Sequence, residues 1–179
     1  MQDESGQMKN KYLIMTIGLY VVWLILAVSL TGCSYVPKNW YDVTLETYRE
    51  GFADHWRGGD LGLNISDEKK DPDNEFGYLL RDLDGDGAPE VLVGLIDDSA
   101  ETKFTDIVIW HRDLGARQVF STGEGYYIYL CDNNVIRMDS WYGSETRTQY
   151  MVYDSSDNAF PIVDGGSRPL KIELTSFTD

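Results

Sequence analysis

The chain contains few of the residues that most catalytic and metal centres use. Its 179 residues include only two histidines and two cysteines, and 15 Lys and Arg stand against 30 Asp and Glu, which gives a net charge of −15. Because phosphate binding requires a positively charged surface, this deficit of basic residues argues against a nucleic acid partner. The acidity is typical of a soluble extracellular surface and suits divalent cations.

Known catalytic patterns are also lacking. His55 and His111 have no cysteine or second histidine at ligand spacing, which argues against a zinc site. The chain has no G-x-S-x-G sequence, so it lacks the nucleophile elbow of α/β-hydrolases. A pair of catalytic carboxylates stays open, because the sequence does not give the distances between the many acidic side chains.

An uncharged apolar stretch, residues 12–30, follows Lys9 and Lys11 near the start of the chain. This order is that of the basic and hydrophobic regions of an export signal. The stretch ends in Leu30-Thr31-Gly32-Cys33, which resembles the lipobox of bacterial lipoproteins at each of its positions. The resemblance implies cleavage before Cys33 and attachment of a diacylglyceryl group to its thiol. A retained membrane anchor is the alternative, because about 20 apolar residues can span a bilayer.

These features predict a chain in three parts. Residues 1–32 are expected to be a lipoprotein signal peptide, residues 33–40 a tether, and residues 41–174 a single domain at the extracytoplasmic face of the cell membrane. A hydrophobic content of 42% is enough for this domain to fold around a core. If Cys33 carries lipid, Cys131 has no partner within the chain, so we expect a buried, inert thiol and no internal disulfide.

The first part of the predicted domain has helical periodicity. Apolar residues at spacings of three and four predict an amphipathic helix over residues 42–56, with Asp42 or Thr44 as its cap and Gly58-Gly59 at its end. The apolar positions are Leu45, Tyr48, Phe52 and Trp56. The following segment, through Glu75, is predicted to be a surface loop.

From Phe76 onward, short β-type runs alternate with turn signals. The turns at 113–116, 133–134 and 154–158 are short enough for hairpins, so successive strands should pair antiparallel. The expected strands are 76–81, 90–96, 105–111, 118–121, 126–131, 135–139, 146–153 and 160–163, with 170–174 as a further candidate. The sequence therefore predicts an α+β fold, mostly β, in which an N-terminal amphipathic helix packs on an antiparallel β-meander.

The segment from Asp82 to Glu90 reads Asp-Leu-Asp-Gly-Asp-Gly-Ala-Pro-Glu. Ca²⁺ binds about six to eight hard oxygens, and a tightly turned backbone with alternating carboxylates lets them converge on one ion. The expected ligands are the carboxylates of Asp82, Asp84, Asp86 and Glu90 and the main-chain carbonyl of Ala88. The alternative is an Asp/Gly-rich turn that binds nothing, although four carboxylates so close together repel one another without a cation.

This loop differs from an EF-hand, because its twelfth position is Val93 rather than glutamate and its flanks are β-type. It resembles the calcium loops of FG-GAP-type and integrin-like propeller repeats, with Glu90 where that family usually has aspartate. A single loop cannot form a propeller, which requires at least four blades. More widely, residues 76–165 are similar to uncharacterised lipoproteins of gut clostridia and their relatives, which pair such a loop with β-strands and an Asn-x-Val-Ile turn like residues 133–136. That resemblance implies no activity.

Trp141 and Tyr142 are the candidate ligand-binding residues. They lie in a loop-like segment, residues 141–144, where exposed aromatic side chains could stack on a sugar ring or a protein partner. We therefore expect a membrane-anchored, non-enzymatic surface binding module that carries a structural Ca²⁺ and recognises a glycan or protein. A cell-envelope hydrolase with an unrecognised carboxylate pair and a structural envelope protein without a ligand are the alternatives.

Overall fold

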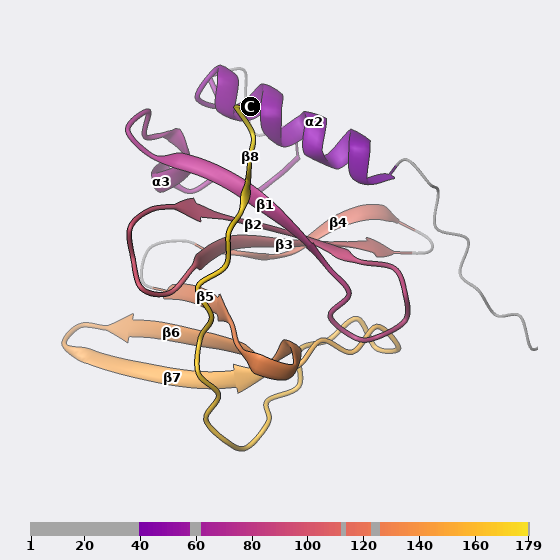
Figure 1. Cartoon of the computed structure of the whole chain (residues 1–179), viewed down its shortest axis with the longest axis vertical. Helices are drawn as coiled ribbons and strands as arrows, with labels where there is room; N and C mark the ends of the chain where they lie inside the picture. Colours follow the sequence, from indigo (N-terminus) through magenta and orange to yellow (C-terminus); the bar gives the residue numbers. More distant parts are fainter. Residues whose placement is uncertain (1–39, 58–61, 112–113, 123–125, 179) are drawn as a thin grey trace, which may run out of the picture. The chain divides into compact units, whose positions relative to one another are not determined.

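The computed structural model describes residues 40–57, 62–111, 114–122 and 126–178. They form an α+β domain that is mostly antiparallel β-sheet, as expected from the sequence (Figure 1). Its elements are α2 (Trp40–Ala53), α3 (Asp67–Lys70), β1 (Glu75–Arg81), β2 (Glu90–Ile96), β3 (Lys103–His111), β4 (Gly115–Ser121), β5 (Tyr126–Leu130), the 3₁₀ turn η1 (Asp132–Asn134), β6 (Ile136–Tyr142), β7 (Glu145–Met151) and β8 (Thr175–Ser176).

The sheet is not the single meander predicted. Its strand order is β7-β6-β5-β3-β2-β1-β8, and β4 also pairs with β3. Residues 106–111 of β3 pair with β4, whereas Lys103 and Phe104 pair with β5. The reason is that β3 has nine residues, so one of its edges is long enough to hold two strands in succession. The chain therefore returns to β3 after β4 and continues as a second antiparallel unit, β5-β6-β7.

The two central strands, β2 and β3, bury side chains on both faces of the sheet. Val91, Val93 and Val108 pack with helix α2 in one cluster, whereas Leu92 and Ile107 belong to another. This second cluster is completed by buried residues of the β5-β6-β7 unit and its surroundings, namely Ile128, Leu130, Ile136, Met151 and Tyr153. Figure 1 shows the resulting arrangement, with α2 next to β1–β4 on one side and β5–β7 on the other.

Helix α2 departs from the predicted amphipathic N-terminal helix over residues 42–56. It begins at Trp40 and ends at Ala53, and its buried residues include Thr44 and Gly51 in addition to Trp40, Leu45 and Tyr48. Trp56 lies beyond the helix end, with a φ of 57°. Its indole ring packs so close to Gly51 that a Cβ there would lie 2.4 Å from the ring. The chain therefore turns back on the helix before the predicted Gly58-Gly59 stop.

The end of the domain also differs from the expectation. Residues 160–163 and 170–174 were predicted as strands, but Ile162 and Pro169 form only isolated bridges, with Met151 and Cys131, and the next strand is β8. This segment instead crosses the sheet toward α2, as Figure 1 shows. Phe177, which is 2% exposed, anchors it in the aromatic cluster under α2. The packed domain thus continues beyond residue 174.

Cys131 is buried and free, in agreement with the expected inert thiol, and burial raises the pKa of its thiol. The predicted signal peptide (residues 1–32), Cys33 and the tether up to residue 39 lie outside the described residues. Within the described ranges, neither of the helices combines the length and the apolar character needed to cross a membrane.

Candidate metal-binding site

The predicted calcium loop joins β1 to β2, which pair antiparallel along their whole length. Residues 82–89 form the connection, and Glu90, the last predicted ligand, is the first residue of β2. Two glycines let the backbone turn tightly, because Gly85 and Gly87 have φ values of 82° and 87°, a region that other residues rarely adopt. The hairpin therefore holds the loop at both of its ends.

The carboxylates of Asp82, Asp84 and Asp86 converge in this loop. Each offers an oxygen, and these oxygens lie within 4.8 Å of one another. Main-chain N–H groups of the loop hold the side chains in place: Gly85 N and Gly87 N donate to the two oxygens of Asp82 at 2.7 and 3.0 Å. The local sequence thus folds into a cradle of oxygen atoms, the ligand type that hard cations prefer.

One oxygen of this cradle has no hydrogen-bond partner. Oδ1 of Asp84 accepts a hydrogen bond from Asp86 N at 3.1 Å, but its Oδ2 is buried without any donor. Leaving a buried acceptor unsatisfied costs about 1–3 kcal/mol, and more for a charged group. A cation bound between the carboxylates would satisfy this oxygen, so the residues present fit a Ca²⁺ ion.

Glu90 lies next to the three aspartates but is not part of their group. Its side chain is 6% exposed and accepts a hydrogen bond from Leu83 N at 2.8 Å. Burial raises the pKa of Glu90 to about 8, and the negative charges of Asp84 and Asp86 add to the rise, whereas the Leu83 N–H opposes it. The structure therefore brings together three of the predicted side-chain ligands and uses the fourth to fix the loop backbone.

Trp141 and Tyr142 were predicted to lie in a loop, but they lie at the end of strand β6. Tyr142 pairs with Glu145 of β7, so only Gly143 and Ser144 form the turn, and the φ of Gly143 is 65°. The Trp141 side chain is 39% exposed and meets the Tyr127 ring edge to face, with centroids 5.4 Å apart. The side chain of Tyr142 lies outside the described part of the structure. One candidate aromatic side chain is thus exposed on a strand.

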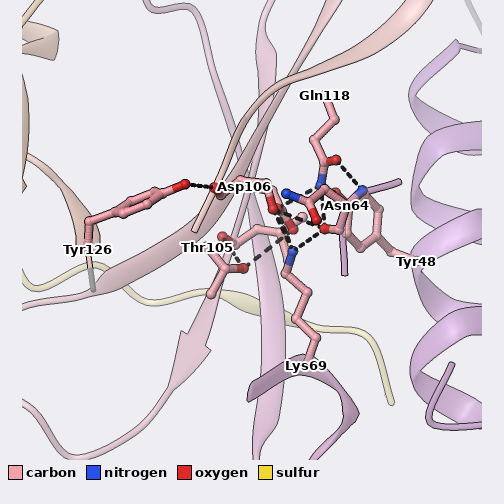
Figure 2. Close-up of polar contacts among 9 residues, drawn as sticks. Tyr48, Asn64, Lys69, Thr105, Asp106, Gln118 and Tyr126 are labelled. Atoms are coloured by element: carbon pink, nitrogen blue, oxygen red, sulfur yellow. Dashed lines mark hydrogen bonds and ion pairs between the residues drawn. The ribbon is translucent and has the colours of Figure 1, made fainter. Parts of the chain in front are cut away.

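A buried polar network lies on the helix side of the sheet and was not predicted. Figure 2 shows Lys69 of α3 pointing at Asp106 of β3, with an Nζ to Oδ1 distance of 2.6 Å. Both side chains are fully buried. The Lys69 ammonium also donates to Asn64 O and Ser121 Oγ, and Gln118 Nε2 donates to Asp106 Oδ1 at 2.8 Å. Burial raises the pKa of Asp106, and the Lys69 charge opposes that rise.

The prediction that the segment through Glu75 is a surface loop is wrong for Lys69, which lies in α3 and is buried. Its side chain is 1% exposed because the short helix α3 turns it toward β3, where all three of its hydrogens find acceptors. The sequence does contain one signal for the pair, since Asp106 directly precedes an apolar run, residues 107–110, in the same strand. A carboxylate at such a position requires a buried partner. The saturated hydrogen bonding makes this network a structural link between α3 and the sheet.

The comparisons with known proteins leave the site to be interpreted from its own geometry. No family model, curated protein or solved structure matches the chain. The fold and the site define a mostly β, antiparallel α+β domain with a carboxylate cradle at the end of its first hairpin.

Replacing Lys69 by methionine is expected to lower the free energy of unfolding by about 3–5 kcal/mol, because it leaves the buried Asp106 carboxylate uncompensated. The double variant Lys69→Met, Asp106→Asn removes both charges and should lose less than the single variant. Chemical denaturation of the three proteins measures these differences. Equal losses in the single and double variants would show that the Asp106 charge does not need Lys69.

Proposed function

We propose that this protein is a membrane-anchored, extracytoplasmic lipoprotein whose domain binds one Ca²⁺ ion at residues 82–90 and acts as a non-enzymatic binding module. The calcium site is carried by the convergence of the Asp82, Asp84 and Asp86 carboxylates, together with the buried Asp84 Oδ2, which has no hydrogen-bond donor. The resemblance to FG-GAP-type loops implies that the Ala88 carbonyl and Glu90 complete the shell, Glu90 through the oxygen that does not accept the Leu83 N–H.

The ion has a structural role in this proposal. The loop joins the two strands of the β1–β2 hairpin at its turn, and Leu83 within it is 5% exposed and belongs to the main core cluster. A cation that neutralises the three carboxylates would stabilise this connection and, through Leu83, the core. Because the ion binds the folded chain only, its binding free energy adds to the stability of the fold.

Titration of the purified full chain with CaCl₂ in detergent is expected to show binding at one site and a rise in Tm. At a free concentration of about 100 times Kd the ion should stabilise the fold by about 2.7 kcal/mol. Asp84→Asn removes one charge from the cradle and keeps the side-chain size, so it should abolish or strongly weaken both effects. Calorimetry and thermal denaturation measure them.

A matched control is Glu50→Gln, which removes one carboxylate from the exposed face of α2 and should titrate like the wild type. Identical flat traces and unchanged Tm values for the wild type and Asp84→Asn would exclude the metal site. Binding that is weakened equally by Glu50→Gln would instead indicate a general effect of the negative surface charge.

The extracytoplasmic location of the domain is proposed from the sequence. A basic segment, an apolar stretch and a cysteine at the lipobox position follow one another at residues 9–33. Lipid chains on Cys33 would hold the domain at the membrane by burying their methylene groups. Carboxylate-rich Ca²⁺ sites suit that compartment, where weaker affinities are sufficient for occupancy.

Metabolic labelling with a tagged fatty acid is expected to mark the wild-type chain and to miss Cys33→Ser. Cys131→Ser is the matched control and should keep the label, because Cys131 is buried in the core. Labelling that persists in Cys33→Ser, or a wild-type chain that takes up no label, would contradict a lipid anchor at this cysteine.

The binding role is proposed from the outer face of the β6–β7 hairpin. Trp141 and Asp139 are two positions apart in β6, so their side chains lie on the same face of the sheet. Thr148 is the cross-strand partner of Asp139. Thr148 Oγ1 donates to Asp139 Oδ1 at 2.8 Å. An exposed indole beside hydroxyl and carboxylate groups suits a sugar ring, which has an apolar face for stacking and hydroxyls for hydrogen bonds.

A panel of soluble oligosaccharides and peptidoglycan fragments is expected to contain a ligand whose affinity falls about fivefold or more in Trp141→Ala, since an aromatic contact contributes on the order of 1 kcal/mol or more. Val43→Ala, which truncates a 62% exposed apolar residue on α2, is the control and should bind like the wild type. A ligand that binds Trp141→Ala and the wild type equally would place the binding surface elsewhere.

A further inference from the structure

The calcium loop is held from outside by a second turn, η1, which joins β5 to β6. Asn134 of this turn donates two hydrogen bonds through Nδ2, to Asp82 O at 2.7 Å and to Leu83 O at 3.2 Å. Both carbonyls lie between the first and second aspartates of the cradle, Asp82 and Asp84. A residue about fifty positions away in the sequence therefore fixes the backbone that separates two of the proposed ligands.

The orientation of the Asn134 amide is itself fixed. Arg81 Nε donates to Asn134 Oδ1 at 2.8 Å, so the NH₂ group must face the loop carbonyls. The backbone of Asn134 has a φ of 59°, in the left-handed region that asparagine tolerates better than most residues. Both the side chain and the backbone conformation at this position thus favour asparagine.

The peptide group between Asp82 and Leu83 is held on both sides. Its carbonyl oxygen accepts the hydrogen bond from Asn134, and its N–H donates to Glu90 Oε2 at 2.8 Å. Two hydrogen bonds on opposite sides of one peptide fix the plane of that peptide. Because the Asp82 side chain leaves the backbone next to it, the direction of the first carboxylate depends on this clamp.

We propose that Asn134 is a positioning residue of the calcium site, which orients the cradle for the ion without contacting it. This inference rests on the calcium site proposed above. Groups that orient the ligands of a metal ion affect its affinity nearly as much as some ligands do, and their loss commonly weakens binding about ten- to hundredfold. The coupling also links metal binding to the β5–β6 turn, so the ion acts on both halves of the sheet.

The test compares Asn134→Gly with Asn133→Gly in the full chain, titrated with CaCl₂. Asn133 is its neighbour in η1, has a φ of 57° and is exposed, so glycine relieves the same backbone strain at either position and only Asn134→Gly removes the bonds to the loop. We expect Asn134→Gly to raise the Kd for Ca²⁺ about ten- to hundredfold and Asn133→Gly to leave it within about twofold of the wild type.

The variant Asn134→Asp provides a second test. It keeps the acceptor for Arg81 but turns an oxygen toward the carbonyls of Asp82 and Leu83, so its Kd should rise at least as much as in Asn134→Gly. The Tm without Ca²⁺ separates positioning from a purely structural role, which would lower that Tm in Asn134→Gly and leave the Kd unchanged. If the wild type binds Ca²⁺ and Asn134→Gly binds it with the same Kd, the inference about Asn134 is overturned but the calcium site is not. If the wild type gives a flat titration, both are overturned.

Discussion

Burial of both faces of β2 and β3 is the constraint on which the rest of the domain depends. Val91, Val93 and Leu92 are at most 1% exposed although they alternate between opposite faces, so each face needs its own cover. Fully burying one such side chain contributes about 1.5–3 kcal/mol, whereas a buried ion pair such as that of Lys69 and Asp106 contributes little net stability. Apolar burial therefore holds α2 and the β5–β7 unit in place, and the ion pair selects how α3 docks on β3.

Because the β5–β7 unit covers one face of β2 and β3, the loop at residues 82–90 lies against the turn η1. At an effective dielectric constant of about 20, two charges 4–5 Å apart repel by roughly 3–4 kcal/mol, which solvent reduces at the exposed Asp86. Main-chain donors relieve part of the repulsion among the three aspartates, but they leave Asp84 Oδ2 without a partner. The hairpin, Glu90 and Asn134 thus hold the carboxylates close together, and the proposed cation would relieve the repulsion that remains.

The elements that depend on neighbouring residues could be predicted from local sequence patterns. The strand β2 and the loop from Asp82 were predicted with the bounds that the structure has, since turn residues and alternating carboxylates determine both. The features that were missed depend on residues far apart in the sequence. The Lys69–Asp106 pair spans 37 positions and the Asn134–Asp82 bond 52, and no periodicity connects them. The placement of Trp56 on the helix was wrong as well, because packing on Gly51, rather than helical spacing, decides where α2 ends.

The central claim is that oxygens of Asp82, Asp84 and Asp86 surround one cation. A high-resolution crystal structure of the protein grown with Ca²⁺ tests it most directly. We expect one strong density peak within about 2.3–2.6 Å of an oxygen from each aspartate, with Asp84 Oδ2 among the ligands. Side chains that point apart into solvent, with only water between them, would contradict it.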